Sequence, residues 1–340
     1  MARRPTQADV ARLAGVSQTV VSHVLNGTQP RAMAPATRER VLAAIEELGY
    51  MPDLTARSLR LKRTNTITVF VPDIVNPFFG LLLTGAQDEA LQAGYDLLIY
   101  HTGGHRELER KALQLALSGR ADAMIGVPYD LERADLKPLT LRGIPTAMLA
   151  RASELDPDRT SGIDLVDVPS EAAAVMLVEH LVARGHTRIA IINGRAGTPP
   201  QINRENGYRQ VLLRHGIPID EGLIYNGDFD ESTGYTRMVE VLARPDRPTA
   251  VFAATDSIAI GAMIASREAG VRIPEQIAIG GIDDIPAARL VSPALTTVNQ
   301  HHDQLGRELV RLVLSRLHDP HPGPGRTVTG RFDLMVREST

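Results

Sequence analysis

A polar run near the amino terminus carries side chains that can hydrogen-bond to the edges of DNA bases. Ser17 can cap a helix over residues 18–25, in which Val21, Val24 and Leu25 share one face. The polar residues on the other side of this helix are Gln18, Thr19, Ser22 and His23. Glutamine can pair with adenine through two hydrogen bonds, and histidine can donate one to guanine. A helix set across another by a tight turn can place such side chains in a DNA major groove, but the spacing alone also fits an ordinary α-hairpin.

The elements around this run predict a small helical head. Thr6 can cap a first helix, and Asp9 completes a capping-box pattern with it. A third helix follows Pro35, which suits a first helical position, and stops at Gly49. Residues 50–65 are polar, basic and short, which is typical of a linker that could hold one more helical turn.

Charge is unevenly distributed along the chain. Residues 1–64 hold ten Lys or Arg and five Asp or Glu, which gives the head a net charge of +5. The whole chain has a net charge of −3, so the remaining residues carry −8. A basic head on an acidic body favours a polyanion-binding module. The alternative is a chance cluster on a solvated face.

From Thr66 onward, apolar strand-like runs alternate with amphipathic helical stretches. Such runs lie at residues 67–71, 97–99, 123–127, 146–149, 189–192, 223–225 and 277–279. Most of them follow a glycine in the position where a helix stops, namely Gly94, Gly119, Gly143, Gly185, Gly216 and Gly270. This rhythm predicts parallel sheets covered on both faces. A polar segment over residues 151–170 divides the series, so we expect two α/β halves with a ligand cleft between them.

Several kinds of chemistry have no support in the sequence. The 340 residues contain no cysteine, which excludes disulfides, thiolate metal sites and a cysteine nucleophile. His301, His302 and the histidines at 318–321 lack the acid partners of a zinc site. The glycine motifs of nucleotide sites and of hydrolase elbows do not occur. No apolar run is long enough for a membrane span, and the start does not read as an export signal. We therefore expect a cytoplasmic protein that is not an enzyme and has no metal or cofactor.

The first run resembles the DNA-binding segment of the lactose-repressor/galactose-repressor (LacI/GalR) family, whose pattern is D-V-A-x-x-A-G-V-S-x-x-T-V-S-x-V-L-N. The resemblance continues through Ala56-Arg57-Ser58-Leu59, Asn76-Pro77-Phe78-Phe79, Gly185-His186, Arg204-x-x-Gly207-Tyr208, Asp256-x-x-Ala259, Gly281-Ile282-Asp283-Asp284 and Val336-Arg337-Glu338-Ser339. It covers the chain essentially from end to end. It implies an α/β fold class, with an all-α helix-turn-helix domain ahead of a periplasmic-binding-protein-like core of two α/β subdomains.

The family pattern also implies domain limits. The helix-turn-helix domain would span residues 1–50 and a hinge segment residues 51–64. The core, residues 65–340, would consist of an N-subdomain (about 65–163 and 292–323) and a C-subdomain (about 164–291 and 324–340).

DNA contacts follow from the resemblance. The implied residues are Thr6, Ser17, Gln18, Thr19, Ser22, His23, Asn26, Arg57 and Leu59. Gln18, Thr19 and His23 would read bases, while the serines and the asparagine would serve phosphates or packing. Leu59 matches the hinge leucine that enters the minor groove as a wedge. Val20 departs from the pattern, because the family usually has threonine there.

The same resemblance implies an effector pocket in the core. Its expected residues are Phe78, Phe79, Arg151, Arg204, Phe229, Thr255, Asp256 and Asp283. The alternatives are purely structural roles: Asp256 would cap a helix, and Arg204 would form an ion pair on the surface. Two departures stand out: Ala150 replaces a common aspartate, and Val168-Pro169 replaces the usual Asp-Asn pair, with Asp167 displaced by one. Two acids that bind hydroxyl groups are then missing.

The resulting expectation is a homodimeric transcriptional regulator, most simply a repressor, that binds a near-palindromic operator in double-stranded DNA and responds to a small molecule such as a sugar. Three other readings stay open at this point. The chain could be a constitutive DNA-binding regulator with a vestigial pocket, a solute-binding protein without a DNA role, or an α/β enzyme acting on a sugar or nucleotide.

Overall fold

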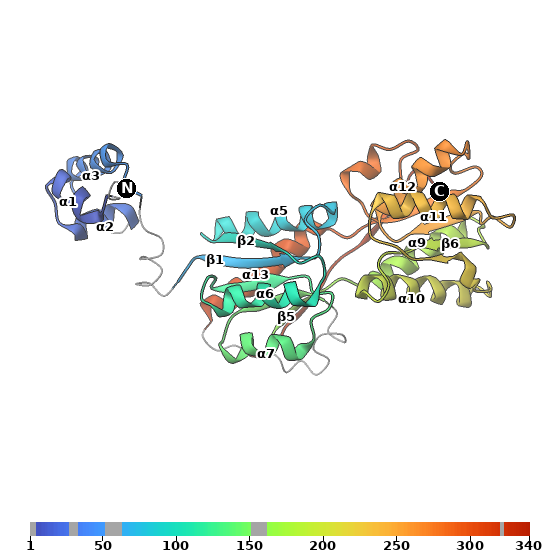
Figure 1. Ribbon diagram of the computed structural model, residues 1–340, viewed down its shortest axis with the longest axis horizontal. Helices are drawn as coiled ribbons and strands as arrows, with labels where there is room; N and C mark the ends of the chain where they lie inside the picture. The colour runs from blue at the N-terminus through green and yellow to red at the C-terminus, as the bar shows by residue number, and fades with distance from the viewer. Residues whose placement is uncertain (1–4, 27–32, 52–62, 151–161, 320–322) are drawn as a thin grey trace. The chain divides into compact units, whose positions relative to one another are not determined.

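The computed structural model describes residues 5–26, 33–51, 63–150, 162–319 and 323–340. The chain divides into two compact units, residues 1–64 and 65–340, which we call the head and the core (Figure 1). Each unit is built around its own apolar interior, so each is described by itself.

The described part of the head contains three helices around a small core. They are α1 (Gln7–Ala14), α2 (Gln18–Asn26) and α3 (Pro35–Leu48). The predicted capping box is confirmed, because the Thr6 hydroxyl and the Asp9 carboxylate each accept from the other's backbone N–H. Gly49 ends α3 in a left-handed conformation, as predicted. Val10, Val21 and Val41 are fully buried where the three helices meet.

The core has two lobes, each with a six-stranded sheet. The sheet of the first lobe has the order β11-β5-β4-β3-β1-β2 and is parallel throughout. Its strands are β1 (Thr66–Val71), β2 (Asp96–His101), β3 (Ala123–Gly126), β4 (Thr146–Leu149), β5 (Asp164–Asp167) and β11 (Thr327–Thr329). Helices α5 (Pro77–Gln92) and α13 (His302–His318) pack on one face, and α6 (Arg106–Leu117) and α7 (Arg133–Leu141) pack on the other.

The sheet of the second lobe has the order β12-β10-β9-β8-β6-β7. Its strands are β6 (Ile189–Ile192), β7 (Ile224–Tyr225), β8 (Ala250–Ala253), β9 (Ala278–Asp283), β10 (Thr296–Asn299) and β12 (Asp333–Met335). Only the pair of β10 and β12 is antiparallel among the described strands. Helices α9 (Ser170–Ala183) and α10 (Pro199–Arg214) cover one face, and α11 (Glu231–Leu242) and α12 (Asp256–Glu268) cover the other. Two short 3-10 turns, η1 (Glu221–Leu223) and η2 (Pro286–Arg289), complete the lobe.

The predicted glycine stops between helices and strands are confirmed. Gly94, Gly119, Gly143, Gly185, Gly216 and Gly270 all have positive φ. Glycine adopts this left-handed conformation without the steric cost that a Cβ atom would add.

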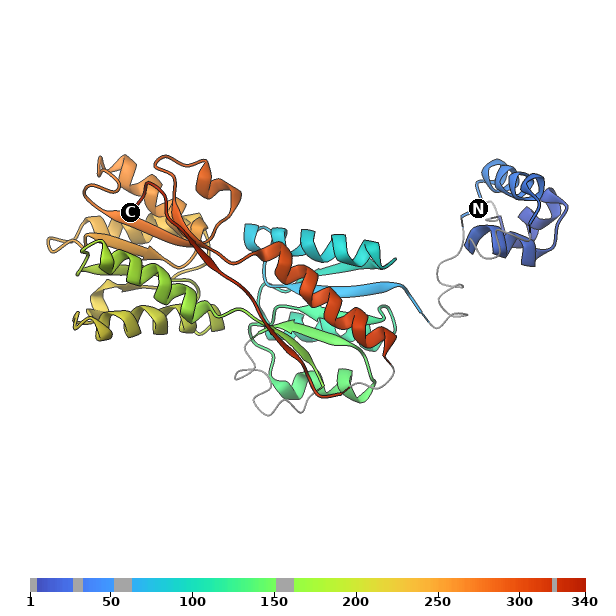
Figure 2. The ribbon, with the colours of Figure 1, turned by 180° about the vertical axis from the view of Figure 1, so that it is seen from behind.

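Three segments connect the two lobes, and they correct the expected subdomain limits. The chain crosses between β5 and α9, between β10 and α13, and between β11 and β12. Figure 2 shows the last of these as an extended segment near the carboxyl terminus. Strands β5 and β11 therefore belong to the first lobe, and β10 to the second, opposite to the expectation for residues 164–167, 327–329 and 296–299. The expectation was wrong there because strands of three or four residues carry no local mark of the sheet that they join.

Candidate functional site

The first candidate surface is the start of α2 in the head. Gly15, with a φ of 64°, turns the chain between α1 and α2. The Ser17 hydroxyl then accepts a hydrogen bond from the backbone N–H of Val20 at 3.4 Å, as a helix cap does. Gln18 and Thr19 are exposed in the first turn of α2, so their side chains are free to meet another molecule.

The remaining predicted DNA contacts are distributed as follows. Ser22 and His23 are partly exposed on α2. Val20 packs against the apolar core of the head, which gives this departure from the family pattern a structural role. Arg57 and Leu59 lie outside the described residues, as does the side chain of Asn26.

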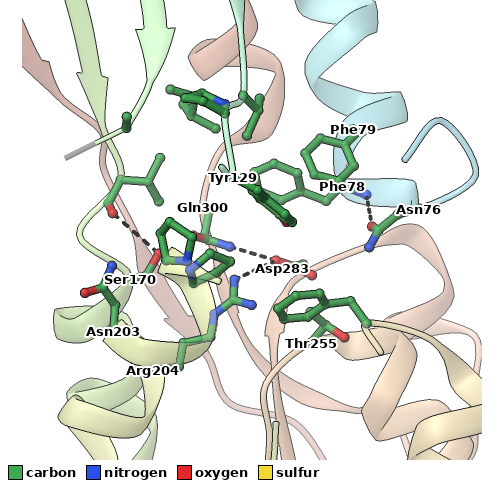
Figure 3. A pocket seen from close by; sticks show the side chains of 18 residues that line it. Asn76, Phe78, Phe79, Tyr129, Ser170, Asn203, Arg204, Thr255, Asp283 and Gln300 are labelled. Carbon is green, nitrogen blue, oxygen red and sulfur yellow. Dashed lines mark hydrogen bonds and ion pairs between the residues drawn. The ribbon is translucent and has the colours of Figure 1, made fainter. Parts of the chain in front are cut away.

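The second candidate site is a pocket between the two lobes of the core (Figure 3). It lies at the carboxyl ends of the parallel strands, where open α/β sheets bind ligands. Its lining residues are Asn76, Phe78, Phe79, Val127, Pro128, Tyr129, Leu149, Ala150, Val168, Ser170, Pro199, Pro200, Asn203, Arg204, Phe229, Thr255, Asp283 and Gln300.

The wall from the first lobe is largely apolar. Asn76 caps α5 by accepting from the Phe78 N–H at 3.0 Å, and this cap sets the two phenylalanines at the pocket. The rings of Phe78 and Phe79 meet edge to face with centroids 4.9 Å apart. Strand ends contribute further apolar side chains: Val127, Leu149, Ala150 and Val168. The two departures from the family pattern thus both border the pocket.

The wall from the second lobe is polar. Arg204 of α10 points into the pocket, and its Nη2 atom lies 3.9 Å from Oδ1 of Asp283. Gln300 donates from Nε2 to the same Oδ1 atom at 2.7 Å. The Nε atom of Arg204 and the Oε1 atom of Gln300 are buried without a hydrogen-bond partner in the described part of the chain. Buried polar atoms of this kind suit a polar ligand, because an unmade hydrogen bond is costly.

The aromatic ring of Phe229 lines the pocket beside Arg204. The guanidinium of Arg204 lies 5.8 Å from the centroid of the Phe229 ring. Phe229 in turn lies directly on Gly194, where a Cβ atom would come within 2.0 Å of the ring. Backbone without a side chain at Gly194 is therefore needed to seat the aromatic ring.

Asp256 does not line the pocket, which differs from the expectation. Thr255 is the cap of α12, since its hydroxyl accepts from the Ile258 N–H at 3.3 Å. Asp256 is fully buried, and its carboxyl group accepts from the Ile285 N–H at 2.9 Å and contacts the Thr297 hydroxyl. Burial, and then the charge of Asp283, raise the pKa of Asp256 to about 8. Its contacts thus fix the segment that follows Asp283 at the end of β9.

A buried glutamate holds the loop that brings Tyr129 to the pocket. Glu109 of α6 is fully buried and accepts from the backbone N–H groups of Tyr129 at 2.8 Å and Asp130 at 3.1 Å. Burial raises the pKa of Glu109, and these hydrogen bonds oppose that shift. Burial also raises the pKa of Tyr129 to about 12.

The structure brings together most of the expected effector residues and adds others. Phe78, Phe79, Arg204, Phe229, Thr255 and Asp283 border one pocket. Arg151 lies outside the described residues. Tyr129, Asn203 and Gln300 also line the pocket and were not predicted from the sequence. Tyr129 and Gln300 each follow a strand directly or within three residues, so the rule that ligands lie at carboxyl ends of strands could have found them.

Other kinds of site can be addressed for the described residues. Across them, no helix combines the length and the apolar character that crossing a bilayer requires. Their His, Asp and Glu side chains form no group of three that could hold a metal ion.

Head and core together define a class: a helix-turn-helix DNA-binding regulator with a two-lobed ligand-binding core. Residues 6–53 match the model for bacterial regulatory proteins of the lacI family, and residues 178–340 match a periplasmic binding protein-like domain. The chain belongs to the lacI family of bacterial regulatory proteins. This family consists of transcriptional regulators, as expected, and not of enzymes.

Relatives cover almost the whole chain. The HTH-type transcriptional repressor PurR of Vibrio atlanticus is 35% identical over 316 residues, which is 92% of each chain. The ribose operon repressor of Escherichia coli is 34% identical over 316 residues, 93% of this chain and 94% of the relative.

Solved structures extend this similarity. A lac repressor dimer bound to operator and the anti-inducer ONPF aligns with a TM-score of 0.83 at 26% identity, covering 99% of both chains. The complex of the transcriptional regulator CelR with cellobiose aligns with a TM-score of 0.72 at 32% identity, covering 99% of this chain and 100% of the other.

Proposed function

We propose that this regulator is a cytoplasmic homodimeric repressor whose hold on a near-palindromic operator is set by a small molecule in the pocket between its lobes. The observation that carries the proposal is the half-polar pocket, with the buried and unpartnered atoms of Arg204 and Gln300, in a chain that also has an exposed α2 surface. The relatives PurR and the ribose operon repressor support the role of a repressor, and the lac repressor dimer on its operator supports the dimer and the DNA partner.

In the head, α2 would enter the major groove. Gln18, Thr19 and His23 would contact base edges, while Ser17, Ser22 and Asn26 would contact phosphates or support the packing. Thr6 would contact phosphate at the start of α1, close to the amino end of that helix. Arg57 would add a sequence-independent phosphate contact, and Leu59 would open a base step from the minor groove.

In the core, the unequal walls define the class of effector. Arg204 and Asp283 would hold a polar edge with hydroxyl or carbonyl groups, and their opposite charges favour a neutral molecule over an anion. Phe78, Phe79 and Phe229 would cover its flat or C–H faces. Because Ala150 and Val168 border the other side, the edge facing the first lobe would carry few hydroxyl groups. A deoxy sugar or a related ring with one apolar edge fits this description better than a fully hydroxylated hexose.

The link between the sites is thermodynamic. An effector that prefers one arrangement of the lobes must change the operator affinity in the corresponding direction, typically by about 1–3 kcal/mol. Closure of the lobes would shift the hinge segments of the two protomers and thereby the spacing of the heads.

The test combines DNA selection with ligand screening. The purified chain should enrich a palindromic sequence from random duplex DNA, and its core should gain thermal stability with a member of a panel of sugars, deoxy sugars and nucleosides. Arg204→Ala should keep the operator affinity and lose the response to that ligand. Arg209→Ala is the matched control, because Arg209 lies on the same helix and pairs with Glu205 and Glu221 outside the pocket. Failure to enrich any palindrome would refute the proposed binding to a palindromic operator. Operator binding without any stabilising ligand would instead favour a regulator with a vestigial pocket.

A further inference from the structure

One arginine of the second lobe reaches across to the backbone of the first lobe. Arg195 lies in the loop between β6 and α10. Its Nη1 atom donates to the Gly103 carbonyl at 3.1 Å, and its Nη2 atom donates to the Gly104 carbonyl at 3.2 Å. The guanidinium also lies 5.9 Å from the ring centroid of Tyr129, a pocket residue of the first lobe. Three contacts therefore join the two lobes through a single side chain.

The receiving backbone is shaped for this guanidinium. Gly103 and Gly104 follow β2 and have φ values of 60° and 63°, a conformation that favours glycine. A Cβ atom on Gly104 would come within 2.2 Å of Nη2 of Arg195 and 2.8 Å of the Tyr129 ring. The Thr102 hydroxyl accepts from the Gly104 N–H at 3.2 Å and so fixes the turn. The planar fork of arginine matches two neighbouring carbonyls, which a lysine cannot do.

The loop that carries Arg195 is also held in place. The Thr198 hydroxyl donates to the Arg195 carbonyl at 2.7 Å. The Gln201 side chain accepts from the Gly197 N–H at 3.0 Å. Phe229 lies against Gly194, next to Arg195 in the chain. Arg195 thus lies in a braced loop that packs against Phe229, a residue of the pocket wall.

The contact between Arg195 and the two glycines lies away from the three segments that cross between the lobes. The crossing segments leave the first sheet from β5 and β11 and enter or leave the second sheet at β10 and β12. Arg195 follows β6, which lies toward the end of the second sheet that is away from β10 and β12. Its glycine partners follow β2, which is the edge strand of the first sheet away from β5 and β11. A small rotation of the lobes about the crossing segments would therefore separate Arg195 from Gly103 and Gly104 first. The two hydrogen bonds at that edge thus depend on the arrangement of the lobes that the structure shows.

We propose that Arg195 is a positioning residue that holds the lobes in the closed arrangement and so couples the pocket to the operator affinity. This inference deepens the proposed function and rests on it for the coupling to DNA. Arg195 touches Tyr129 and the Gly103-Gly104 turn without being a lining residue of the pocket. It thus tunes the population of closed molecules instead of choosing the ligand.

The population of closed molecules can be measured directly. The chain has no cysteine, so Lys111→Cys on α6 and Arg267→Cys on α12, both exposed, give one spin-label pair across the lobes. Labelled chains diluted with excess unlabelled chain report the distance within one protomer. Arg195→Ala and Gly104→Ala should each move the mean distance by more than about 2 Å or broaden it, and Arg195→Lys should give an intermediate result. The operator selected with the unaltered chain should bind both alanine variants with an affinity changed at least about fivefold, in the same direction.

Two controls separate this effect from general damage. Arg244→Ala removes an arginine that also donates to a glycine carbonyl, that of Gly222 at 3.0 Å, but within the second lobe. Gly94→Ala introduces the same kind of backbone strain at a φ of 76° with open space around the Cβ position. Both should keep the distance distribution and the operator affinity of the unaltered chain.

Each outcome decides a part of the proposal. Distance distributions of Arg195→Ala and Gly104→Ala that coincide with those of the controls would overturn the holding role. A shifted distance with unchanged operator affinity would overturn the coupling. If the unaltered chain selects no operator, the proposed function fails, while the distance measurement still tests the contact between the lobes.

Discussion

Burial outweighs hydrogen bonding at Asp256. In the folded chain its pKa is raised to about 8 from 3.8, so the proton stays on well above the pH at which the unfolded chain loses it. A raised folded-state pKa stabilises the fold fully below pH 4, and this contribution is lost as the pH rises toward 8. Asparagine imitates the neutral acid, because its amide can donate toward Thr297 and accept from Ile285.

We therefore expect Asp256→Asn to flatten the dependence of stability on pH. Between pH 4 and 8, the free energy of unfolding of the unaltered chain should fall relative to the variant by at least about 1.4 kcal/mol, the equivalent of one pKa unit. Chemical denaturation at several pH values measures this difference, with the exposed Asp228→Asn as the control for the change in charge. Parallel pH profiles for the variant and the unaltered chain would contradict the assignment.

Single residues could be foreseen where local rules decide them. Thr6, Gly15 and Ser17 act as caps and stops because the helix ends that they satisfy lie within three residues of them. Asp256 was misjudged because its partners, Ile285 and Thr297, come from elements far along the chain. The approach of such partners is fixed by the packing of the lobe, which no local pattern reveals.

At the scale of elements, α6 controls a pocket that it does not line. Glu109 accepts from the backbone N–H groups of Tyr129 and Asp130, and alanine would leave these donors buried without partners. Glu109→Ala should therefore lower the free energy of unfolding by about 2–4 kcal/mol. Glu107→Ala, exposed on the same helix, should change it by less than about 0.5 kcal/mol in urea denaturation. Equal effects of the two variants would remove the anchoring role.

The α2 helix yields a prediction on specificity. His23→Ala should change the base preference at one operator position by about 1–3 kcal/mol, because a contact to a base edge is lost. Arg57→Ala should weaken binding to all sequences alike and reduce its salt dependence, as expected for a phosphate contact. Binding to an array of single-base operator variants distinguishes the two patterns. Uniform losses from both variants would refute base reading by His23.

The alternation of helices and strands could be predicted from the sequence, but the sheet that β5, β10 and β11 each join could not. Apolar runs after glycine stops predicted strands such as β4 and β6, since both signals are local. The sheet that a strand joins depends on pairing across long separations, as for β11 beside β5. Three crossings were therefore predicted from the sequence, but each of them was placed too early in the chain. Residues such as Gln300, which lies where the chain passes between the lobes, were not predicted.

For the whole molecule, the proposed dimer would gain its specificity from joining two heads. The nine residues of α2 can contact only a few base pairs, too few to mark one site in a genome. The basic head supplies attraction to any DNA, while the acidic body, at a net charge of −8, adds none. A dimer that presents two heads to two half-sites multiplies the discrimination of each head.

This arrangement makes the spacing of half-sites a sharp test. Insertion of five base pairs at the centre of the selected operator turns one half-site by about half a helical turn, so both heads can no longer bind the same face. The specific affinity should fall at least about tenfold in a mobility-shift titration, toward that of a single half-site. The same five base pairs placed outside the operator serve as the control and should leave the affinity unchanged. Equal affinity for the two DNAs would mean that the heads bind independently, and a ligand-driven change in head spacing could then have no effect on the operator.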